Sequence, residues 1–418
     1  MLLSRLTQRA TRLRRFVAIA LVGCLIAVGG CGSSLTTNSQ ARVLTIVVNP
    51  YADVDWDTFG HYRAALHTHT LQSDGRHSAK DVVTAYHQAG FAILAITDHD
   101  THKPNRHVER GNVPKEQASP YPLDPKPENY PANTTWPWTA FGAKAPESLG
   151  MVGIEGNEIS NRHHMNSLFN GFGVPQKNMD EDEQLFAIRD HGGLAFLNHP
   201  GIAAKWWTRR PVDWYVERFA KHGPAYLVGI EVTNCTTETY TYDEGLWDQL
   251  LARFMPGRPI WGFGTEDTHK LADARESDSV FVLKELSESA VRKAMEAGQF
   301  YFRKSTRRND FRQREPAETL YPRIRAIEVD DKAGTITVRA ANHDLIRWIS
   351  SPESLEAVAD YKTDNAPWPL GCVVHEGETL NYRNATNLKN YVRVELQRTD
   401  GKEVYRTFTN PFGLAMRN

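Results

Sequence analysis

Short apolar runs rich in β-branched residues alternate with helical patterns from about residue 63 to residue 300. Two of these patterns predict helices, one at Ser78–Ala89 with Ser78 as its N-cap and one at Ser287–Ala297 before Gly298. The predicted strands are Tyr62–His67, Ala92–Thr97, Met151–Ile154, Leu194–Leu197, Leu227–Val232, Ile260–Gly264 and Val280–Leu283. This alternation favours a parallel α/β architecture, either a barrel or a doubly wound sheet.

Residues 103–150 interrupt the alternation. The segment contains nine prolines, from Pro104 to Pro146, together with aromatic residues such as Trp136 and Trp138. A long stretch without periodicity inside a domain often serves as a lid or a binding loop. The alternative is a surface excursion that is packed by its own aromatic side chains.

After residue 320 the hydrophobic pattern changes to period two, which predicts antiparallel strands. A hairpin turn is expected at Asp400-Gly401. The predicted strands are Arg323–Asp330, Thr335–Ala341, Ile346–Ser350, Tyr391–Arg398 and Val404–Thr409. We therefore predict a main domain over residues 51–320 and a small antiparallel β domain over residues 321–418, the latter without obvious chemistry.

The overall composition is that of a globular protein, with 24% charged residues and a net charge of −1. Residues 1–30 distort this balance because they contain five arginines and no acid, and without them the net charge becomes −6. An acidic chain of this kind argues against a nucleic-acid-binding role. We expect a small-molecule substrate instead.

The N-terminal arginines are followed by an apolar segment from Phe16 to Val28, which is too short for a comfortable membrane span but suits a signal peptide. It ends in Val28-Gly29-Gly30-Cys31, which resembles a bacterial lipobox. The resemblance implies cleavage before Cys31, lipidation of that cysteine, and a tether and first strand over residues 31–50. An uncleaved anchor is the alternative. Both place the folded part outside the cytoplasm, in the periplasm or at the cell surface, held at a bacterial membrane.

Two cysteines, Cys235 and Cys372, would remain in the mature chain. They could form a disulfide in an oxidising compartment. Unpaired cysteines buried in the core are the alternative, and the spacing of the two residues does not decide between them.

Histidine and acidic residues follow several of the predicted strands. His67 and His69 lie two positions apart on an extended chain, so both imidazoles project to one face and can reach one metal ion. Asp267 and His269 repeat this spacing. Parallel α/β sheets carry their active sites at the carboxyl ends of their strands, and these residue types bind Zn, Mn and Fe, so we predict a multi-metal centre. Further residues at such positions are Asp98, His99, Glu158, Asn198 and His199.

Five segments, in this order along the chain, form a more specific pattern: LHTHTLQSDG, AITDHD, GNEIS, FLNHP and GTEDTH. They resemble the motifs of the PHP family, named for polymerase and histidinol phosphatase, over about residues 60–305. The resemblance implies a distorted (β/α)7 barrel that holds two or three divalent metal ions and hydrolyses phosphate esters. The ligands that it implies are His67, His69, Asp74, His99, Glu158, His164, His199, Asp267 and His269.

The family arrangement, carried across, implies that Glu158 bridges two metal ions. Some assignments have alternatives: Asp74 could merely shape a turn, Glu155 competes with Glu158, and His163 competes with its neighbour His164. Mixed nitrogen and oxygen ligation does not choose among Zn, Mn and Fe. The three implied ligand groups are His67, His69, Glu158 and Asp267; Glu158, His164 and His199; and Asp74, His99 and His269.

Two metal ions a few ångström apart lower the pKa of a bridging water and supply hydroxide at neutral pH. That hydroxide would attack phosphorus or a carbonyl carbon, with His269 or His163 as the candidate that protonates the leaving group. Glu231, in the segment IEVTN, is either an outer partner of a ligand or a structural residue. Candidate phosphate clamps, for which ordinary surface charge is the alternative, are Arg162, Lys205, Arg209 and Arg210.

The leading prediction is a lipid-anchored, metal-dependent phosphoesterase of the PHP type. The overall layout also resembles PHP proteins related to carbaryl hydrolase, which cleave carboxyl or carbamate esters, and the ligand set does not decide between the two substrates. An amidohydrolase is a more distant alternative, since it also begins with His-x-His on a strand. A different class is a binding protein in which the metals are structural and the β domain recognises a surface glycan.

Overall fold

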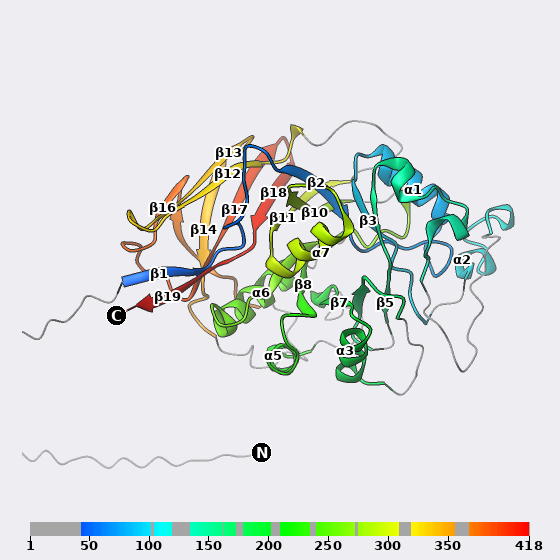
Figure 1. Ribbon diagram of the computed structural model, residues 1–418, viewed down its shortest axis with the longest axis horizontal. Helices are drawn as coiled ribbons and strands as arrows, with labels where there is room; N and C mark the ends of the chain where they lie inside the picture. The colour runs from blue at the N-terminus through cyan, green and yellow to red at the C-terminus, as the bar shows by residue number, and fades with distance from the viewer. Residues whose placement is uncertain are drawn as a thin grey trace, which may run out of the picture. The chain divides into compact units, whose positions relative to one another are not determined.

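The computed structural model describes a mixed α/β fold with additional antiparallel strands (Figure 1). The predicted signal peptide with Cys31, and also Cys235, lie outside the described residues, so lipidation and disulfide pairing stay predictions. No helix within the described part of the chain is long and apolar enough to cross a membrane. The described residues are 43–101, 104–118, 134–160, 162–172, 179–201, 210–234, 240–271, 275–308, 319–355 and 368–417.

One sheet begins with three parallel strands, β2 (Gly60–Ala65), β3 (Ile93–Ala95) and β4 (Val152–Ile154). On the other side of β2 it continues antiparallel through β10 (Arg275–Leu283) and β11 (Phe300–Arg308). The strands β3 and β4 are apolar and buried throughout because both of their faces are covered, whereas β2 is buried only at its last two residues, Ala64 and Ala65. The carboxyl ends of β2 and β3 lead directly into the His67 and His99 segments.

A second sheet has five strands, β5 (Gly156–Ile159), β6 (Met165–Leu168), β7 (Leu194–Leu197), β8 (Leu227–Thr233) and β9 (Trp261–Gly264). The β5, β6 and β7 strands pair antiparallel, whereas β7, β8 and β9 are parallel. The sequence pattern did not predict β5 and β6, because each has only four residues and carries polar side chains that face the site.

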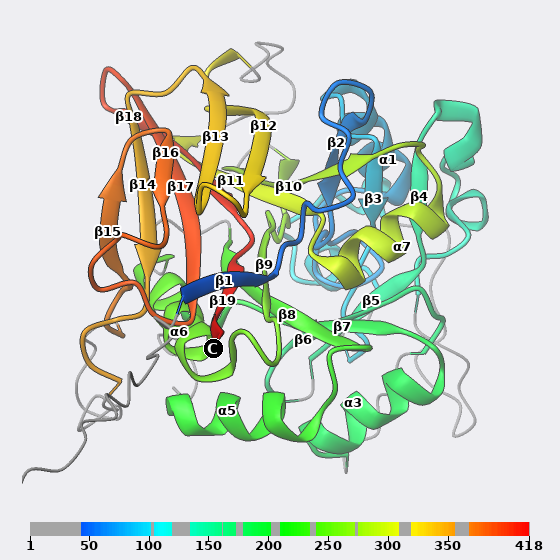
Figure 2. The same cartoon turned by 60° about the vertical axis from the view of Figure 1, so that its left-hand side comes forward.

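Three helices cover one face of this second sheet: α3 (Glu181–Asp190), α5 (Val212–Lys221) and α6 (Tyr240–Phe254). Figure 2 shows α3 and α5 along one side of β7 and β8. Their apolar side chains form one buried cluster with residues of β7 and β8. This layer fixes the strands whose ends carry the histidines and acids.

The two predicted helices are confirmed almost to the residue as α1 (Ala79–Gln88) and α7 (Glu288–Ala297). Ser78 and Ser287 are their N-caps, each accepting a hydrogen bond from the backbone three residues on. Gly298 ends α7 in the left-handed region, at φ 73°, a conformation that favours glycine. Local sequence alone was enough here because the caps act within one turn.

The described part of the 103–150 segment is short-helical and packs on α1. It contains α2 (Arg106–Glu109) and three 3₁₀ helices, of which η2 (Trp138–Phe141) buries both of its terminal aromatic rings. Trp136 packs edge-on against Trp138 at 6.0 Å. The remaining two are η1 (Lys115–Gln117) and η3 (Pro146–Leu149).

The described strands do not close into a continuous barrel. The two sheets are instead joined by two isolated parallel bridges, Thr68 with Thr268 and His99 with Glu158. Both bridges lie at the strand ends that carry the histidines and acids. The closed (β/α)7 barrel implied by the family resemblance therefore stays a prediction.

The antiparallel strands predicted after residue 320 are confirmed, and the Asp400-Gly401 turn joins β17 to β18. Of these strands, β12, β13 and β16 form a separate three-stranded sheet, whereas β14, β15, β17 and β18 extend the first sheet because β18 pairs with β11. The predicted domain boundary at residue 320 stays a prediction. The strands and their bounds are β12 Arg323–Asp330, β13 Thr335–Ala341, β14 Leu345–Ser350, β15 Cys372–Glu376, β16 Thr379–Asn381, β17 Tyr391–Asp400, β18 Glu403–Thr409 and β19 Phe412–Arg417, with β1 Val43–Val48 paired to β19.

Candidate metal centre

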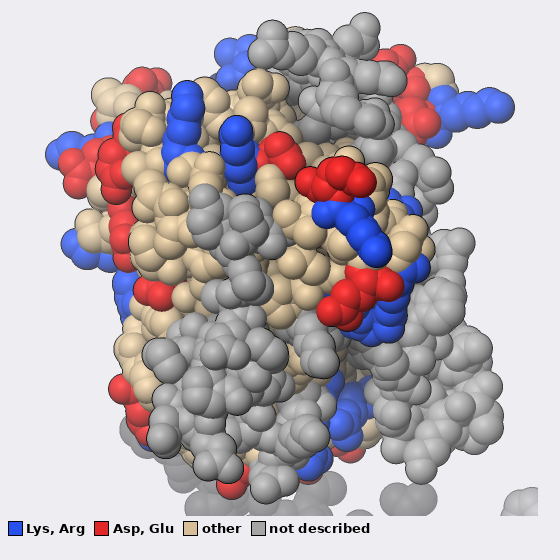
Figure 3. All heavy atoms as spheres, turned by 90° about the vertical axis from the view of Figure 1, so that its right-hand side faces the viewer, with Lys and Arg blue, Asp and Glu red and all other residues tan. Residues whose placement is uncertain are grey.

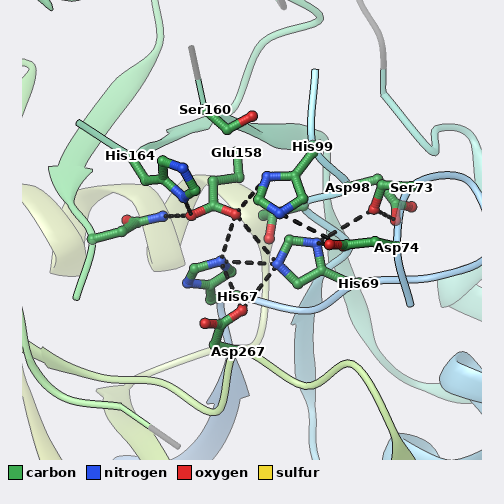
Figure 4. A network of polar contacts seen from close by, with 12 residues as sticks. His67, His69, Ser73, Asp74, Asp98, His99, Glu158, Ser160, His164 and Asp267 are labelled. Carbon is green, nitrogen blue, oxygen red and sulfur yellow. Dashed lines mark hydrogen bonds and ion pairs between the residues drawn. The ribbon is translucent and has the colours of Figure 1, made fainter. Parts of the chain in front are cut away.

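His67 and His69 follow β2, and their imidazoles turn toward the same point (Figure 4). Their Nε2 atoms lie 3.1 Å apart. Glu158 Oε2, from β5, lies 3.2 Å from Nε2 of His67 and 3.3 Å from Nε2 of His69. Asp267 Oδ1 approaches the same two nitrogens from the opposite side, at 3.4 Å and 3.0 Å. Four donor atoms from three separate segments converge.

Glu158 is fully buried at the centre of the cluster and directs its two oxygens to different neighbours. Its Oε1 lies 3.0 Å from both His164 Nδ1 and His199 Nε2. The same oxygen accepts a hydrogen bond of 2.8 Å from the side-chain amide of Asn198. Its Oε2 faces His67 and His69 and also lies 3.0 Å from His99 Nδ1. One carboxylate therefore links two sets of imidazoles.

A third group gathers around Asp74 on the outer side of His69. Asp74 Oδ1 lies 3.2 Å from His269 Nε2 and 3.5 Å from His99 Nε2. The ring of His69 stacks against the rings of both His269 and His99, at centroid distances of 4.3 Å and 4.5 Å. Gly75 makes this arrangement possible, because a Cβ there would lie 2.5 Å from the backbone of His69.

Glu231, at the end of β8, holds residues of two groups in place. Its Oε1 accepts from His67 Nδ1 at 2.7 Å and from the Thr265 hydroxyl at 2.7 Å. Its Oε2 accepts from the backbone N–H of His199 at 2.7 Å and from the Asn234 amide at 2.9 Å. With the Nδ1 proton of His67 directed at Glu231, the Nε2 of the neutral ring keeps its lone pair. Of the two roles predicted for Glu231, the geometry is that of an outer partner of a ligand.

Asp98 organises the loop after β2 and belongs to none of the donor groups. Its carboxylate accepts from the backbone N–H and the hydroxyl of Thr70, at 2.7 Å and 2.6 Å. It also accepts from the hydroxyls of Ser73, at 2.6 Å, and of Thr135, at 2.5 Å. Since Thr135 belongs to the 103–150 segment, this segment is tied to the loop that carries Asp74.

Two of the converging residues sit in a backbone conformation that costs energy. His199 has φ 27° and Asp267 has φ 48°, both in the left-handed region that non-glycine residues rarely adopt. Such residues cluster at functional sites, where the surrounding structure holds them in place. Here the Glu231 bond to the backbone of His199 supplies part of that support.

The histidines and carboxylates of the cluster shift one another's pKa values. Burial by itself lowers the pKa of His67, but the carboxylates of Glu158 and Asp267 outweigh it and hold this pKa well above its usual value. Burial is outweighed in the same way at His69, where these carboxylates raise the pKa to about 10. Conversely, the surrounding imidazoles hold the pKa of Glu158 and of Asp267 far below the usual range, against the effect of burial. His99 differs, because burial lowers its pKa to about 3. The ionised carboxylates of Glu158 and Asp267 are therefore stabilised by positive charge next to them, which is supplied by protons on the imidazoles or by metal ions.

The donor set fits divalent metal ions. Glu158 Oε2 and Asp267 Oδ1 are buried and form no hydrogen bond with the described residues, although imidazole nitrogens lie close to both. Donors about 2.0–2.1 Å from one metal ion lie about 2.9–3.4 Å apart, depending on its geometry. The spacings of 3.0–3.4 Å around His67 and His69 fall in this range. The buried histidines and acids thus form clusters suited to a polynuclear metal site.

All nine residues implied as ligands lie in this cluster, and the alternatives lie elsewhere. Glu155, the competitor of Glu158, accepts a hydrogen bond from Thr134 at 3.1 Å. His163 packs against the rings of Trp214 and Tyr215, and burial holds its pKa well below the usual value. Its predicted role as a proton donor stays a prediction.

Two of the four predicted phosphate clamps, Arg162 and Arg210, belong to the described part of the chain. Lys205 and Arg209 lie outside the described residues, and Arg162 is exposed. Arg210 pairs with Glu181 at 2.8 Å. On the face over α1 and α2, acidic and basic side chains alternate among the described residues (Figure 3).

Arg106 was missed by the sequence analysis and lies at the edge of the third group. Its Nη1 is 3.7 Å from Asp74 Oδ2, and its side chain is 30% exposed. Another missed residue is Tyr86 of α1, whose hydroxyl donates to Glu266 Oε2 at 2.5 Å, next to Asp267. No local pattern marks either residue, because each reaches the site from a helix remote in sequence.

Comparison with known proteins gives only distant similarity. No family model and no curated protein matches the chain. A two-domain protein from Bacteroides vulgatus, described as containing a predicted PHP-like metal-dependent phosphoesterase, is 16% identical, with a TM-score of 0.45 over 85% of this chain and 93% of that one. A lesion-specific endonuclease from Pyrococcus furiosus is also 16% identical, with a TM-score of 0.36 over 57% and 56% of the two chains. Both TM-scores are below 0.5, so neither similarity supports a conclusion about the function of this chain.

Proposed function

We propose that this protein is a metal-dependent hydrolase of the PHP type that cleaves phosphate esters. The observation that carries the proposal is Glu158, whose two oxygens face separate sets of imidazoles within one buried cluster. A carboxylate shared in this way is what two neighbouring metal ions require of a bridging ligand. The motif resemblance supports the same reaction class.

Two or three ions would be held by the three ligand groups described above. Zn, Mn and Fe all suit a mixture of imidazole and carboxylate donors. When bound, such ions lower the pKa of water and neutralise charge that develops on the oxygens of the scissile group. Glu231 and Asn198 keep His67 and Glu158 in the orientation that directs their free lone pairs into the cluster.

The exposed side of the cluster is the side of the third group. The side chains of His269, Arg106 and Asp74 are 35%, 30% and 16% exposed, whereas those of His67 and His69 are fully buried. A substrate would therefore reach the cluster past His269. The Nδ1 of His269 is bonded to the backbone oxygen of Asp267, so with two ions bound and the third group empty, its Nε2 is the atom that would exchange a proton with a leaving group.

A phosphate ester is favoured over a carboxyl or carbamate ester by Arg106. Its guanidinium lies beside the exposed donors, and guanidinium groups bind phosphate oxygens in pairs. A carboxyl ester carries no negative charge in its ground state and would gain nothing from this cation.

The test is a substrate panel of p-nitrophenyl phosphate, bis-p-nitrophenyl phosphate and p-nitrophenyl acetate, assayed with Mn or Zn. We expect turnover of a phosphate substrate and a fall in kcat/KM of at least about 100-fold in the Glu158→Gln variant, since a bridging ligand matters at least as much as its outer partners. Glu147→Gln, at an exposed residue of η3, is the matched control. Hydrolysis of the acetate alone would overturn the phosphoesterase proposal in favour of the carboxyl-ester alternative.

We further propose that the chain is anchored to a bacterial membrane through a lipid on Cys31. The support is the arginine-rich start, the short apolar segment and the lipobox-like Val28-Gly29-Gly30-Cys31. Metabolic labelling with palmitate should mark the wild type and not Cys31→Ser. Equal labelling of the two chains would contradict the proposal.

A further inference from the structure

The hydroxyl of Tyr86, in α1, lies behind the metal cluster, next to the segment that carries Asp267. The Tyr86 side chain is fully buried, and its ring packs edge-on against Phe91 at 4.9 Å. Trp138 and Phe141 of η2 belong to the same buried apolar cluster. Packing therefore fixes the ring, and the hydroxyl is the part of Tyr86 that needs a separate explanation.

The Tyr86 hydroxyl contacts both sequence neighbours of Asp267. It donates to Glu266 Oε2 at 2.5 Å and lies 2.9 Å from Thr268 Oγ1. The Thr268 hydroxyl in turn lies 3.3 Å from Glu266 Oε2, so the three side chains form a closed triangle. The carboxylate of Asp267 instead reaches the imidazole nitrogens that follow β2 (Figure 4). One hydroxyl thus holds the residues on both sides of a proposed ligand.

The same hydroxyl is linked to the other ligand pair, His67 and His69. Thr68, the residue between these histidines, forms an isolated parallel bridge with Thr268. The backbone N–H of His69 donates to the backbone oxygen of Thr268 at 3.0 Å. Thr268 therefore joins the first pair to Tyr86.

The phenol keeps its proton and acts as a donor. Burial raises the pKa of Tyr86 well above its usual value, and the negative charge of Glu266 raises it further, whereas the hydroxyls of Thr268 and Thr68 oppose this to a smaller extent. Because Glu266 is 1% exposed, its bond to Tyr86 is a charge-assisted hydrogen bond that is shielded from water.

We propose that Tyr86 is a positioning residue that fixes Asp267 relative to His67 and His69 and so sets the geometry of one metal position. The inference rests on the metal binding of the proposed function. Asp267 needs such support, because its φ of 48° is a conformation that costs energy and that the surrounding structure must hold.

The effect of Tyr86 should be confined to one metal position. Glu158 lies in β5, and His164 and His199 lie next to β6 and β7, whereas the contacts of the Tyr86 hydroxyl described above lie after β2 and β9. An ion held by Glu158, His164 and His199 would therefore keep its ligands when the hydroxyl is removed. A general loss of stability would instead weaken every metal position alike.

The test is the number and affinity of Zn ions bound by the full chain, measured by equilibrium dialysis and elemental analysis. Tyr86→Phe removes one oxygen and keeps the packed ring. We expect one ion to bind about 10- to 100-fold more weakly than in the wild type, the usual effect of losing an outer partner of a ligand, while another ion keeps its affinity. Tyr382→Phe, beside β16, is the matched control, because its hydroxyl also bonds a carboxylate, that of Asp331 at 3.0 Å, in a sheet without any of the implied ligands.

A second measurement separates the geometry of the site from stability. At saturating Co²⁺ the visible absorption of Tyr86→Phe should differ from that of the wild type, because the ligands are displaced even when the positions are full. If Tyr86→Phe does not fold, Thr268→Val, which removes the facing hydroxyl, is expected to weaken the same ion.

A folded Tyr86→Phe or Thr268→Val with wild-type affinities and a wild-type Co²⁺ spectrum would overturn the proposal. Equal weakening of all bound ions would also overturn it, because that is the result of a purely structural role. Hydrolysis of phosphate esters is assayed separately, so a wild type that binds metal but turns over no phosphate ester is recognised as a failure of the proposed function alone.

Discussion

Replacing Glu231 by glutamine exchanges one of the two oxygens that hold both halves of the metal cluster in position. The wild-type carboxylate accepts four hydrogen bonds, two on Oε1 from His67 and Thr265 and two on Oε2 from His199 and Asn234. An amide has only one oxygen, so two of the four donors must face an NH₂ group. The side chain is fully buried, and water cannot take over as a partner.

The size of the effect of Glu231→Gln depends on which hydrogen-bond donors the glutamine amide leaves without an acceptor in each of its two orientations. If the NH₂ group faces the backbone of His199, two buried donors lose their acceptor, at about 1–3 kcal/mol each. If it faces His67, the imidazole can relieve the conflict by moving its proton from Nδ1 to Nε2. The Nε2 proton would then point at His69 and Glu158, where a metal ion is expected. Either outcome should weaken metal binding by about 10- to 100-fold, the usual effect of losing an outer partner of a ligand.

The assay is metal content by mass spectrometry after equilibrium dialysis against a competing chelator, in parallel with thermal unfolding. Glu231→Gln should lose metal at a lower chelator concentration than the wild type and should unfold at a lower temperature. Glu147→Gln, exposed on η3, serves as the control. A Glu231→Gln protein that folds and retains wild-type metal affinity would show that this carboxylate does not orient His67.

Three further outcomes are expected. Because carboxylates raise the pKa of metal-free His69 to about 10, protons compete with metal, and apparent metal affinity should rise from pH 6 to pH 8; a flat titration would contradict this. Asp248→Asn leaves buried Arg393 uncompensated and should cost about 3–5 kcal/mol in chemical denaturation; a loss below about 1 kcal/mol would be inconsistent with a buried pair. Asp182, whose pKa is held low by Lys221, stabilises the fold above about pH 4 and loses this effect on acidification; Asp182→Asn should flatten the acid limb of thermal stability.

Local sequence was sufficient wherever the cause of a structure lies within a few residues. Ser78 and Ser287 were recognised as helix caps because a cap bonds to the backbone three positions away. The strands after residue 320 were recognised because one covered and one exposed face produce period two. The short strands β5 and β6 were missed, since their polar side chains serve the site and hide the apolar pattern.

The chemical character of the site could be predicted from local sequence, because the spacing of His67 and His69 puts two imidazoles on one face. The family resemblance of the ordered motifs implies the nine residues that the structure brings together. How these residues are held depends on contacts between elements that lie far apart in the chain. Glu231 reaches His67 across 164 positions, and Arg106 approaches Asp74 from a segment without any regular pattern. The pairing of β18 with β11 likewise joins the C-terminal strands to the first sheet. Such contacts depend on how separate elements pack against one another. That packing is decided by side chains along the whole chain, so no single segment predicts it.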